Sequence, residues 1–263
     1  MTNKGTIRTW FARFLMMVGV MLVTILPASA SAGVADSTYY NVGILTQSEI
    51  SGVSGLSKGD IIVMTPTDNM YYIGSAAWDQ VVNGHVKIIC VPGVGSSSVG
   101  AAAFAKHIAS IKSESVAAIV VGYGDGSIYT EGPQGYYIGR PSNIAGIWYE
   151  EPASQTLVDL YAAGARPDML VGHSKGNMDI ANALFKMYNN GHVSWYKGVT
   201  FKTFGCGVNV PTGIGTFQQY IGTLDSLGYM NTVSWKNMTY IYGRYHTTNP
   251  FYALTYMPIQ YYL

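Results

Sequence analysis

Short apolar runs alternate with amphipathic segments along most of the chain. Four runs rich in Val, Ile or Phe predict buried strands, at residues 86–91, 116–122, 169–171 and 198–205. Residues 177–188 repeat apolar positions with the period of a helix, and helices are also expected at residues 99–112 and from about residue 152. Buried strands that alternate with helices predict an α/β protein, with a mostly parallel central sheet and helices on both of its faces.

The pattern changes in two further parts of the chain. Residues 37–84 hold strand-like runs at 39–45, 60–64 and 70–73, which predict an antiparallel start to the sheet. Residues 123–151 lack clear periodicity and are rich in Gly, Tyr and Pro. A segment of this length without periodicity is often a lid or a binding loop. Because it follows a strand, it is expected to overhang the site, although a loop packed flat on the surface is the alternative.

The N-terminal segment has the composition of an export signal. Lys4, Arg8 and Arg13 precede an apolar run at residues 15–26, and overlapping Ala-x-Ala sites end at Ala30 and Ala32. This order predicts a secretory signal peptide over residues 1–30, cleaved after Ala30 or Ala32, and a secreted or periplasmic protein. An uncleaved anchor is the alternative, but the run is shorter than the ~20 residues of a spanning helix. Residues 31–263 suit a single catalytic domain.

Charge and cysteine content narrow the classes of partner. Cleavage removes three of the 15 basic residues and none of the 14 acidic ones, so no basic excess remains to suggest nucleic acid. No second apolar run predicts a membrane span, although the aromatic residues 251–263 leave peripheral lipid contact open. Cys90 and Cys206 lie near the ends of the strands on either side of the 169–171 strand, which favours two buried free thiols over a disulfide. No Cys/His cluster has metal-ligand spacing, so neither a metal nor a cofactor is expected.

The sequence Gly172-His173-Ser174-Lys175-Gly176 lies between a predicted strand and a predicted helix. Strand, sharp turn and helix form the context of a nucleophile elbow, in which the serine stands exposed at the tip. The two glycines lack the Cβ atoms that would clash where the backbones pass closely. A glycine-rich turn with a capping serine is the alternative.

Chain order then limits the partners of Ser174, because this class of triad runs serine, acid, histidine. The acids that follow are Asp179 and Asp225, and the histidines are His192 and His246. Asp179 lies in the first turns of the helix, where it would stabilise the dipole, and His192 lies in that helix's stop signal. Asp225 and His246 both follow strand-like runs, at 216–222 and 238–243, and are therefore the candidate acid and base. An ordinary surface Asp and a C-terminal loop His are the alternatives.

These motifs resemble the α/β hydrolases. The strand at 86–91, its glycine loop at 92–98 and the following helix resemble the oxyanion loop of that superfamily. The elbow and the Thr203-Phe204-Gly205 strand end resemble secreted lipases, particularly the class 3 group. The resemblance implies the α/β-hydrolase fold, with Ser174 as nucleophile, Asp225 as acid and His246 as base. It also implies that the N–H groups of Lys175 and Val94 form the oxyanion hole.

The chain departs from this family at several positions. Pro92 stands where many relatives have His or Arg, and Lys175 and Asn177 stand where a typical lipase elbow has Leu and Gly. The separation between Asp225 and His246 is also shorter than in the class 3 group. These departures put the subfamily and the substrate in doubt more than the type of reaction.

The sequence thus predicts an exported serine hydrolase that cleaves carboxylic esters, with a lipid or another small acyl ester as substrate. Tyr137, Ile138 and Trp148, in the aperiodic segment, are candidates for an apolar wall against the acyl chain. An acyltransferase would use the same triad, and a non-catalytic exported binding protein could retain the same scaffold. The sequence does not distinguish acyl-chain length, headgroup or oligomeric state.

Overall fold

The computed structural model describes residues 34–122 and 135–263. The predicted signal peptide and the first part of the predicted lid segment, residues 123–134, lie outside the described residues. The chain divides into two compact units, residues 1–31 and 32–263. All described residues belong to the second unit. None of the helices in the described ranges is long and apolar enough to cross a membrane.

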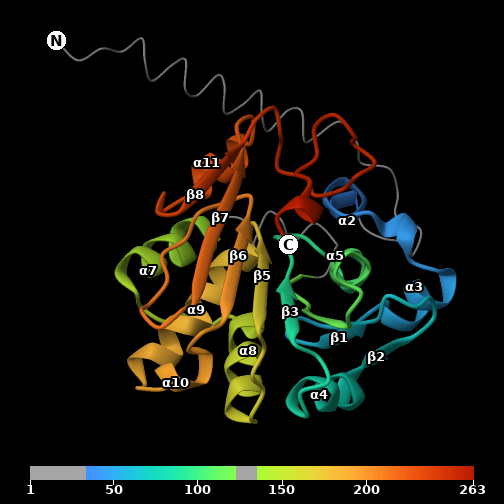
Figure 1. Ribbon diagram of the computed structural model, residues 1–263, viewed down its shortest axis with the longest axis horizontal. Helices are drawn as coiled ribbons and strands as arrows, with labels where there is room; N and C mark the ends of the chain where they lie inside the picture. The colour runs from blue at the N-terminus through green and yellow to red at the C-terminus, as the bar shows by residue number, and fades with distance from the viewer. Residues whose placement is uncertain (1–33, 123–134) are drawn as a thin grey trace. The chain divides into compact units, whose positions relative to one another are not determined.

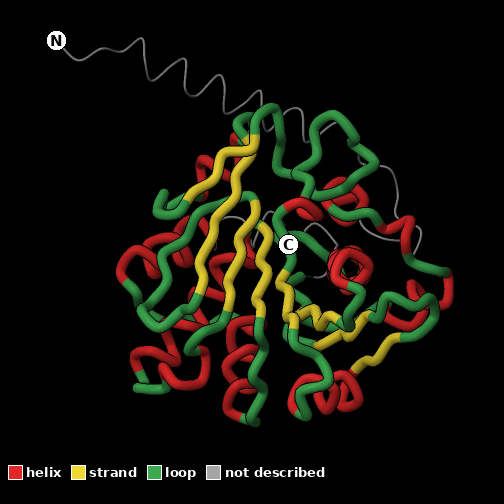
Figure 2. Tube along the Cα trace, viewed as in Figure 1, coloured by secondary structure: helices red, strands yellow, loops and turns green. Residues whose placement is uncertain are grey.

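A single eight-stranded sheet forms the centre of the second unit, in the order β2-β1-β4-β3-β5-β6-β7-β8 (Figures 1 and 2). The strands are β1 (Ile61–Met64), β2 (Tyr71–Ile73), β3 (Ile88–Val91), β4 (Val116–Ile119), β5 (Met169–His173), β6 (Thr200–Phe204), β7 (Thr216–Gly222) and β8 (Met238–Ile241). Strand β1 pairs antiparallel with β2 and β4. The pairs from β4 through β8 are parallel. The expected antiparallel start and parallel centre are both present.

Alternate residues of the central strands fill two separate cores, because successive side chains of a strand point to opposite faces. In β1, Ile61 and Val63 join one apolar cluster, and Ile62 and Met64 join the other. All four are buried. A strand buried on both faces has an unbroken apolar sequence, which is why these runs were recognisable in the chain.

Helices cover both faces of the sheet (Figure 1). Helix α5 (Ser98–Lys112) packs on one face, together with α2 (Val34–Tyr39), the 3-10 turn η1 (Val42–Ile44) and α3 (Gln47–Val53). On the other face lie α4 (Gly74–Val82), α8 (Pro152–Ala162), α9 (Lys175–Asn189) and α10 (Val193–Tyr196). The remaining helical segments are η2 (Gly135–Gly139), α7 (Arg140–Ala145), α11 (Ser226–Asn231) and η3 (Ile259–Tyr261). This is the α/β-hydrolase fold, as the sequence predicted.

The prediction of a strand at residues 39–45 is wrong, because this segment forms the end of α2 and then η1. Tyr40, near the start of the expected strand, is buried against Phe104 of α5 and forms hydrogen bonds through its hydroxyl. Asp36 of α2 accepts hydrogen bonds from the N–H (2.9 Å) and the hydroxyl (2.5 Å) of Ser97, which caps α5. These tertiary contacts outweigh the β-propensity of an aromatic and branched run.

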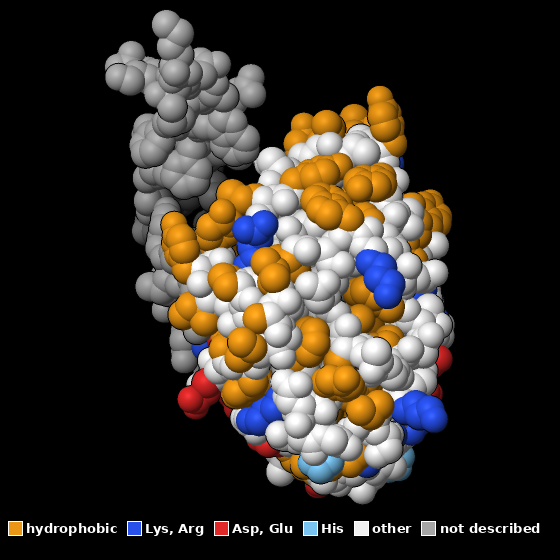
Figure 3. All heavy atoms as spheres, turned by 90° about the vertical axis from the view of Figure 1, so that its left-hand side faces the viewer, with side chains coloured by type: hydrophobic (Ala, Val, Ile, Leu, Met, Phe, Trp, Pro, Cys, Tyr) orange, Lys and Arg blue, Asp and Glu red, His pale blue; other side chains and the backbone are white. Residues whose placement is uncertain are grey.

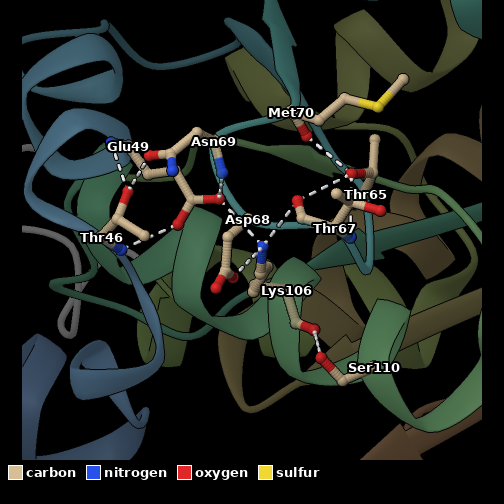
Figure 4. A network of polar contacts seen from close by, with 9 residues as sticks. All are labelled: Thr46, Glu49, Thr65, Thr67, Asp68, Asn69, Met70, Lys106 and Ser110. Carbon is tan, nitrogen blue, oxygen red and sulfur yellow. Dashed lines mark hydrogen bonds and ion pairs between the residues drawn. The ribbon is translucent and has the colours of Figure 1, made fainter.

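A buried ion pair fixes α3 and the β1–β2 turn to α5 (Figure 4). Lys106 of α5 lies 2.9 Å from a carboxylate oxygen of Glu49 and 3.1 Å from one of Asp68. Glu49 also completes a capping box with Thr46 at the start of α3. Because every group in this network has a partner within it, we assign it a structural role.

The surface carries few charges, in keeping with a charged fraction of 11%. Figure 3 shows apolar side chains spread among uncharged polar ones over one face, with isolated Lys and Arg side chains between them. Several exposed aromatic side chains belong to β8 and its neighbours, among them Trp235 and Tyr240, whose rings stack with centroids 6.4 Å apart.

The carboxyl ends of the parallel strands meet at one edge of the sheet, where such folds collect functional groups. Strand β3 leads into the glycine loop, β5 into Ser174 and β6 into Gly205. Asp225 follows β7 and His246 follows β8. The topology therefore gathers the predicted nucleophile, acid, base and oxyanion loop at one edge.

Candidate functional site

Ser174 stands at a sharp turn between β5, which ends at His173, and α9, which begins at Lys175. Its backbone has φ 54° and ψ −123°, a conformation that a residue with a side chain rarely adopts. Tight packing requires the flanking glycines. A Cβ on Gly176 would overlap the carbonyl oxygens of Val91 and Pro92, and one on Gly172 would overlap the side chain of Asn177. This is the geometry of a nucleophile elbow.

Asn177 and Cys206 hold the elbow against the end of β6. The Asn177 amide donates to the carbonyls of Phe204 (2.9 Å) and Cys206 (3.0 Å), and the Ser174 N–H donates to Phe204 at 2.8 Å. Burial raises the pKa of the Cys206 thiol to about 12, so it stays protonated and donates to the Ser174 carbonyl at 3.1 Å. Both Cys206 and Cys90 are buried free thiols, as the sequence favoured.

Asp225 and His246 form a close pair. His246 Nδ1 lies 2.8 Å from each carboxylate oxygen of Asp225. The Asp225 side chain is buried, and its Oδ1 also accepts a hydrogen bond of 2.6 Å from the Gly228 N–H as the N-cap of α11. A carboxylate in this position fixes the ring orientation of the histidine and places a proton on Nδ1, which leaves Nε2 free to accept one.

Two glycines show how the serine, the pair and the glycine loop lie together. A Cβ on Gly205, the residue after Phe204, would lie 2.9 Å from His246 Cε1. A Cβ on Gly93 would lie 3.0 Å from the Cβ of Ser174. Within the described part of the chain, no hydrogen bond joins the Ser174 hydroxyl to His246. Such bonds are often long in unliganded sites and shorten when substrate binds.

Lys175 has two separate features at the start of α9. Its backbone N–H belongs to the first turn, where helical N–H groups lack acceptors within the helix. Its side chain is buried and pairs with Asp179 at 2.9 Å and Glu151 at 3.0 Å. Burial acts to lower the pKa of Lys175, but the two carboxylates outweigh burial, so the pKa lies above its ordinary value. Asp179 is thus the ionic partner of Lys175, and Asp225, not Asp179, contacts His246.

Sequence reasoning missed two residues beside the site, His173 and Tyr40. His173 Nε2 lies 2.7 Å from the backbone oxygen of His246, and its Nδ1 lies 2.8 Å from the Tyr40 hydroxyl. The same hydroxyl accepts a hydrogen bond of 2.6 Å from the Gly93 N–H. His173 directly precedes the serine, which was the one available signal. Nothing in the sequence marks Tyr40 among 21 tyrosines.

The described part of the predicted lid, residues 135–151, is partly helical and packs on α9 through η2 and α7. Tyr137 and Ile138 are 73% and 48% exposed. Trp148, in contrast, packs against the core of this face, and the Lys186 ammonium lies 4.0 Å from its ring centroid. Lys186 is about 18 Å along α9 from Ser174, at ~1.5 Å per residue. The structure therefore places Trp148 away from the nucleophile, contrary to its expected place in an acyl-chain wall.

Among the residues that the structure describes, no group of three or more His, Cys, Asp or Glu side chains could hold a metal ion. A comparison with protein-family models gives no match to this chain, and neither does one with curated proteins. One similar solved structure is a dienelactone hydrolase-like promiscuous phosphotriesterase from metagenomic libraries. It has 17% sequence identity and a TM-score of 0.40, over 66% of this chain and 79% of that chain. A likeness this distant carries no information about the reaction.

Proposed function

We propose that this protein is a serine hydrolase that cleaves carboxylic esters through an acyl-enzyme. The observation that carries the proposal is the Asp225–His246 pair, with Nδ1 2.8 Å from both carboxylate oxygens, at the same sheet edge as a serine with φ 54°. A strained elbow holds a nucleophile at the carboxyl end of a strand, and an oriented imidazole activates it. A turn that only connects a strand to a helix requires neither feature.

The proposed reaction follows from the positions of these groups. His246 Nε2 takes the proton of the Ser174 hydroxyl as the oxygen attacks the ester carbonyl, and Asp225 stabilises the imidazolium that forms. The N–H groups of Lys175 and Val94 donate hydrogen bonds to the carbonyl oxygen and stabilise its negative charge. The imidazolium then protonates the leaving alcohol. Water attacks the acyl-enzyme by the same route and releases the acid.

The proposed substrate is an ester with an apolar acyl group, such as a lipid. Tyr137 and Ile138 support this choice, since both are exposed large side chains on η2, which packs on α9, the helix that begins after Ser174. Water-exposed apolar groups of this kind favour a substrate that covers them.

Export is also a proposal, and it rests on the basic, apolar and Ala-x-Ala order of residues 1–32. Expression of the full chain in a bacterial host, followed by mass determination of the extracytoplasmic protein, tests it. A mature chain that begins at Ser31 or Gly33 is expected. An intact chain recovered only inside the cell would refute export and leave the proposed chemistry untouched.

The decisive experiment measures hydrolysis of p-nitrophenyl esters by wild type and by Ser174→Ala. The variant should lose about 10⁶-fold in turnover, by analogy with triad serines, and keep the wild-type circular dichroism spectrum. A fluorophosphonate probe should label the wild-type protein and not the variant. Ser110→Ala is the matched control, because the Ser110 hydroxyl donates only to the Lys106 carbonyl within α5. Turnover in Ser174→Ala within tenfold of wild type would remove the proposed mechanism.

A further inference from the structure

Three segments of the candidate site are joined by one buried chain of hydrogen bonds. It runs from the N–H of Gly93 in the glycine loop to the hydroxyl of Tyr40, and from there to the ring of His173 at the end of β5. It ends on the backbone carbonyl of His246. Tyr40 and His173 are both 1% exposed, so water does not compete for these bonds.

The direction of every bond in this chain is determined. A carbonyl oxygen only accepts, so His173 Nε2 must carry the proton that binds His246. Burial, followed by the neighbouring His246, lowers the pKa of His173 to about 3, and the ring is neutral. Its Nδ1 is therefore an acceptor, and the Tyr40 hydroxyl donates to it. The tyrosine oxygen in turn accepts from Gly93. Burial raises the pKa of Tyr40, which keeps its proton in place.

We propose that Tyr40 and His173 are positioning residues that hold the backbone of His246 and the glycine loop in register with Ser174. His173 is covalently joined to Ser174. A displacement of Tyr40 or of the His246 backbone therefore strains the residue that precedes the nucleophile. Gly93 directly precedes Val94, whose N–H is the proposed oxyanion donor. The pair thus connects the nucleophile, the base and the oxyanion loop. This inference rests on the proposed function and adds two residues to it.

Residues 37–39, which directly precede Tyr40, also bind the three residues that follow His246. Thr247 and Thr248 donate through their hydroxyls to the carbonyls of Thr38 (2.6 Å) and Tyr39 (2.8 Å). The Asn249 amide donates to the Ser37 carbonyl at 2.6 Å. The ring of Tyr39 meets that of His246 edge-on, with centroids 5.7 Å apart. Residues 37–40 therefore fix both the position of His246 and the route of the loop that follows it.

The alternative is that these hydrogen bonds stabilise the core and have no bearing on the site. The two interpretations differ in what they predict for variants that stay folded. A positioning role predicts loss of kcat with little change in KM, because misplacement by about 1 Å can cost on the order of 10²-fold in rate. A purely structural role predicts a lower melting temperature with unchanged kinetic constants.

The test compares Tyr40→Phe, His173→Leu and His173→Gln with wild type. Tyr161→Phe is the matched control, because Tyr161 is equally buried and its hydroxyl has no hydrogen-bond partner among the described residues. Kinetic constants are measured with a p-nitrophenyl ester. In parallel, ¹⁵N-histidine NMR at pH 7 follows the His246 Nδ1–H proton that binds Asp225, which requires no turnover.

Tyr40→Phe and His173→Leu should lower kcat by about ten- to a hundredfold, with KM within about threefold, and should shift or broaden the His246 Nδ1–H resonance. His173→Gln, which can keep an N–H toward the His246 carbonyl, should retain more activity than His173→Leu. Wild-type kcat and an unmoved resonance in Tyr40→Phe and His173→Leu would overturn the inference, as would an equal loss in Tyr161→Phe. A wild-type protein without esterase activity would instead refute the proposed function, and the resonance would still decide whether Tyr40 and His173 position His246.

Discussion

Asp225 uses one carboxylate for two tasks, since it orients His246 and also caps α11 through the Gly228 N–H. The two tasks can be separated chemically. An asparagine keeps an oxygen for the cap but presents an N–H₂ or a neutral oxygen to the imidazole. An alanine removes both interactions.

Asp225→Asn should therefore lower kcat on the order of 10⁴-fold, because the imidazole adopts the wrong tautomer, while the melting temperature stays near that of wild type. Asp225→Ala should lose as much activity and in addition about 1 kcal/mol of stability through the lost cap. Ester kinetics and urea unfolding measure the two effects. Asp225→Asn keeps the cap and Asp225→Ala removes it. A similar loss of stability in both variants would therefore contradict the separation of the cap from the orientation of His246.

At the scale of elements, the start of α9 depends on a cation that is buried between two carboxylates. A carboxylate that acted only on the helix dipole would contribute a few tenths to about 1 kcal/mol. Asp179 instead pairs with a buried ammonium, and both side chains are at most 5% exposed. Removing one partner of such a pair leaves a poorly compensated charge in the interior.

Lys175→Met should therefore destabilise the protein by about 3–5 kcal/mol, because it leaves two buried carboxylates without their cation. Asp179→Asn should cost less, since Glu151 remains as a partner at 3.0 Å. Asp159→Asn on the neighbouring α8 is the control, because that carboxylate is exposed. Urea unfolding ranks the three variants. A change below 1 kcal/mol in Lys175→Met would show that the cluster is not important for stability.

The segment that contains η2 and α7 gives a prediction about the acyl-chain length of the substrate. Each buried methylene of an acyl chain contributes ~0.8 kcal/mol, so a wall formed by Tyr137 and Ile138 should make kcat/KM rise with chain length. Replacing both residues by Ser should flatten this rise from C2 to C12 esters and leave short esters nearly unchanged. Trp148→Ala should lower stability without changing the slope, because Trp148 packs against Lys186. Parallel profiles for wild type and the double variant would refute the wall.

The sequence predicted elements and the candidate site to different extents, for physical reasons. Strands such as β3 and β5 are buried on both faces, and their continuous apolar runs are visible without a structure. The order of Ser174, Asp225 and His246 along the chain was equally visible. Residues 39–45 were mispredicted because their conformation is set by partners far along the chain. For the same reason the contact between Tyr40 and His173 was not predictable.

At the scale of the whole molecule, a buried histidine, His173, and a half-buried one, His107, make stability depend on pH. Burial lowers the pKa of His107 to about 4, and burial together with His246 lowers that of His173 to about 3. Their unfolded value is ~6.5, so below that pH the unfolded chain binds more protons than the folded one. The stability that these neutral rings provide is complete above pH ~6.5 and is lost as the pH falls toward 4 and 3.

His107→Gln should flatten this acid limb by up to about 1.4 kcal/mol per pH unit between pH 6 and 4. Urea unfolding at several pH values gives the slopes. His85→Gln replaces an exposed histidine and should leave the slope as in wild type. A steeper limb in His107→Gln would contradict the assigned direction of the shift.

The contact of residues 37–39 with residues 247–249 joins positions up to 212 apart in the chain. A ribosome adds roughly 5–20 residues per second, so about 10 to 40 seconds separate the synthesis of the two sides. Ser174 is added 72 residues before its proposed base His246, so for the last roughly 4 to 14 seconds of that interval the serine exists without the base. We therefore expect the site to assemble as one of the last steps in the synthesis and folding of each molecule. In a cell that makes this protein, Ser174 would be present in an inactive form until His246 and residues 247–249 have been added to the chain.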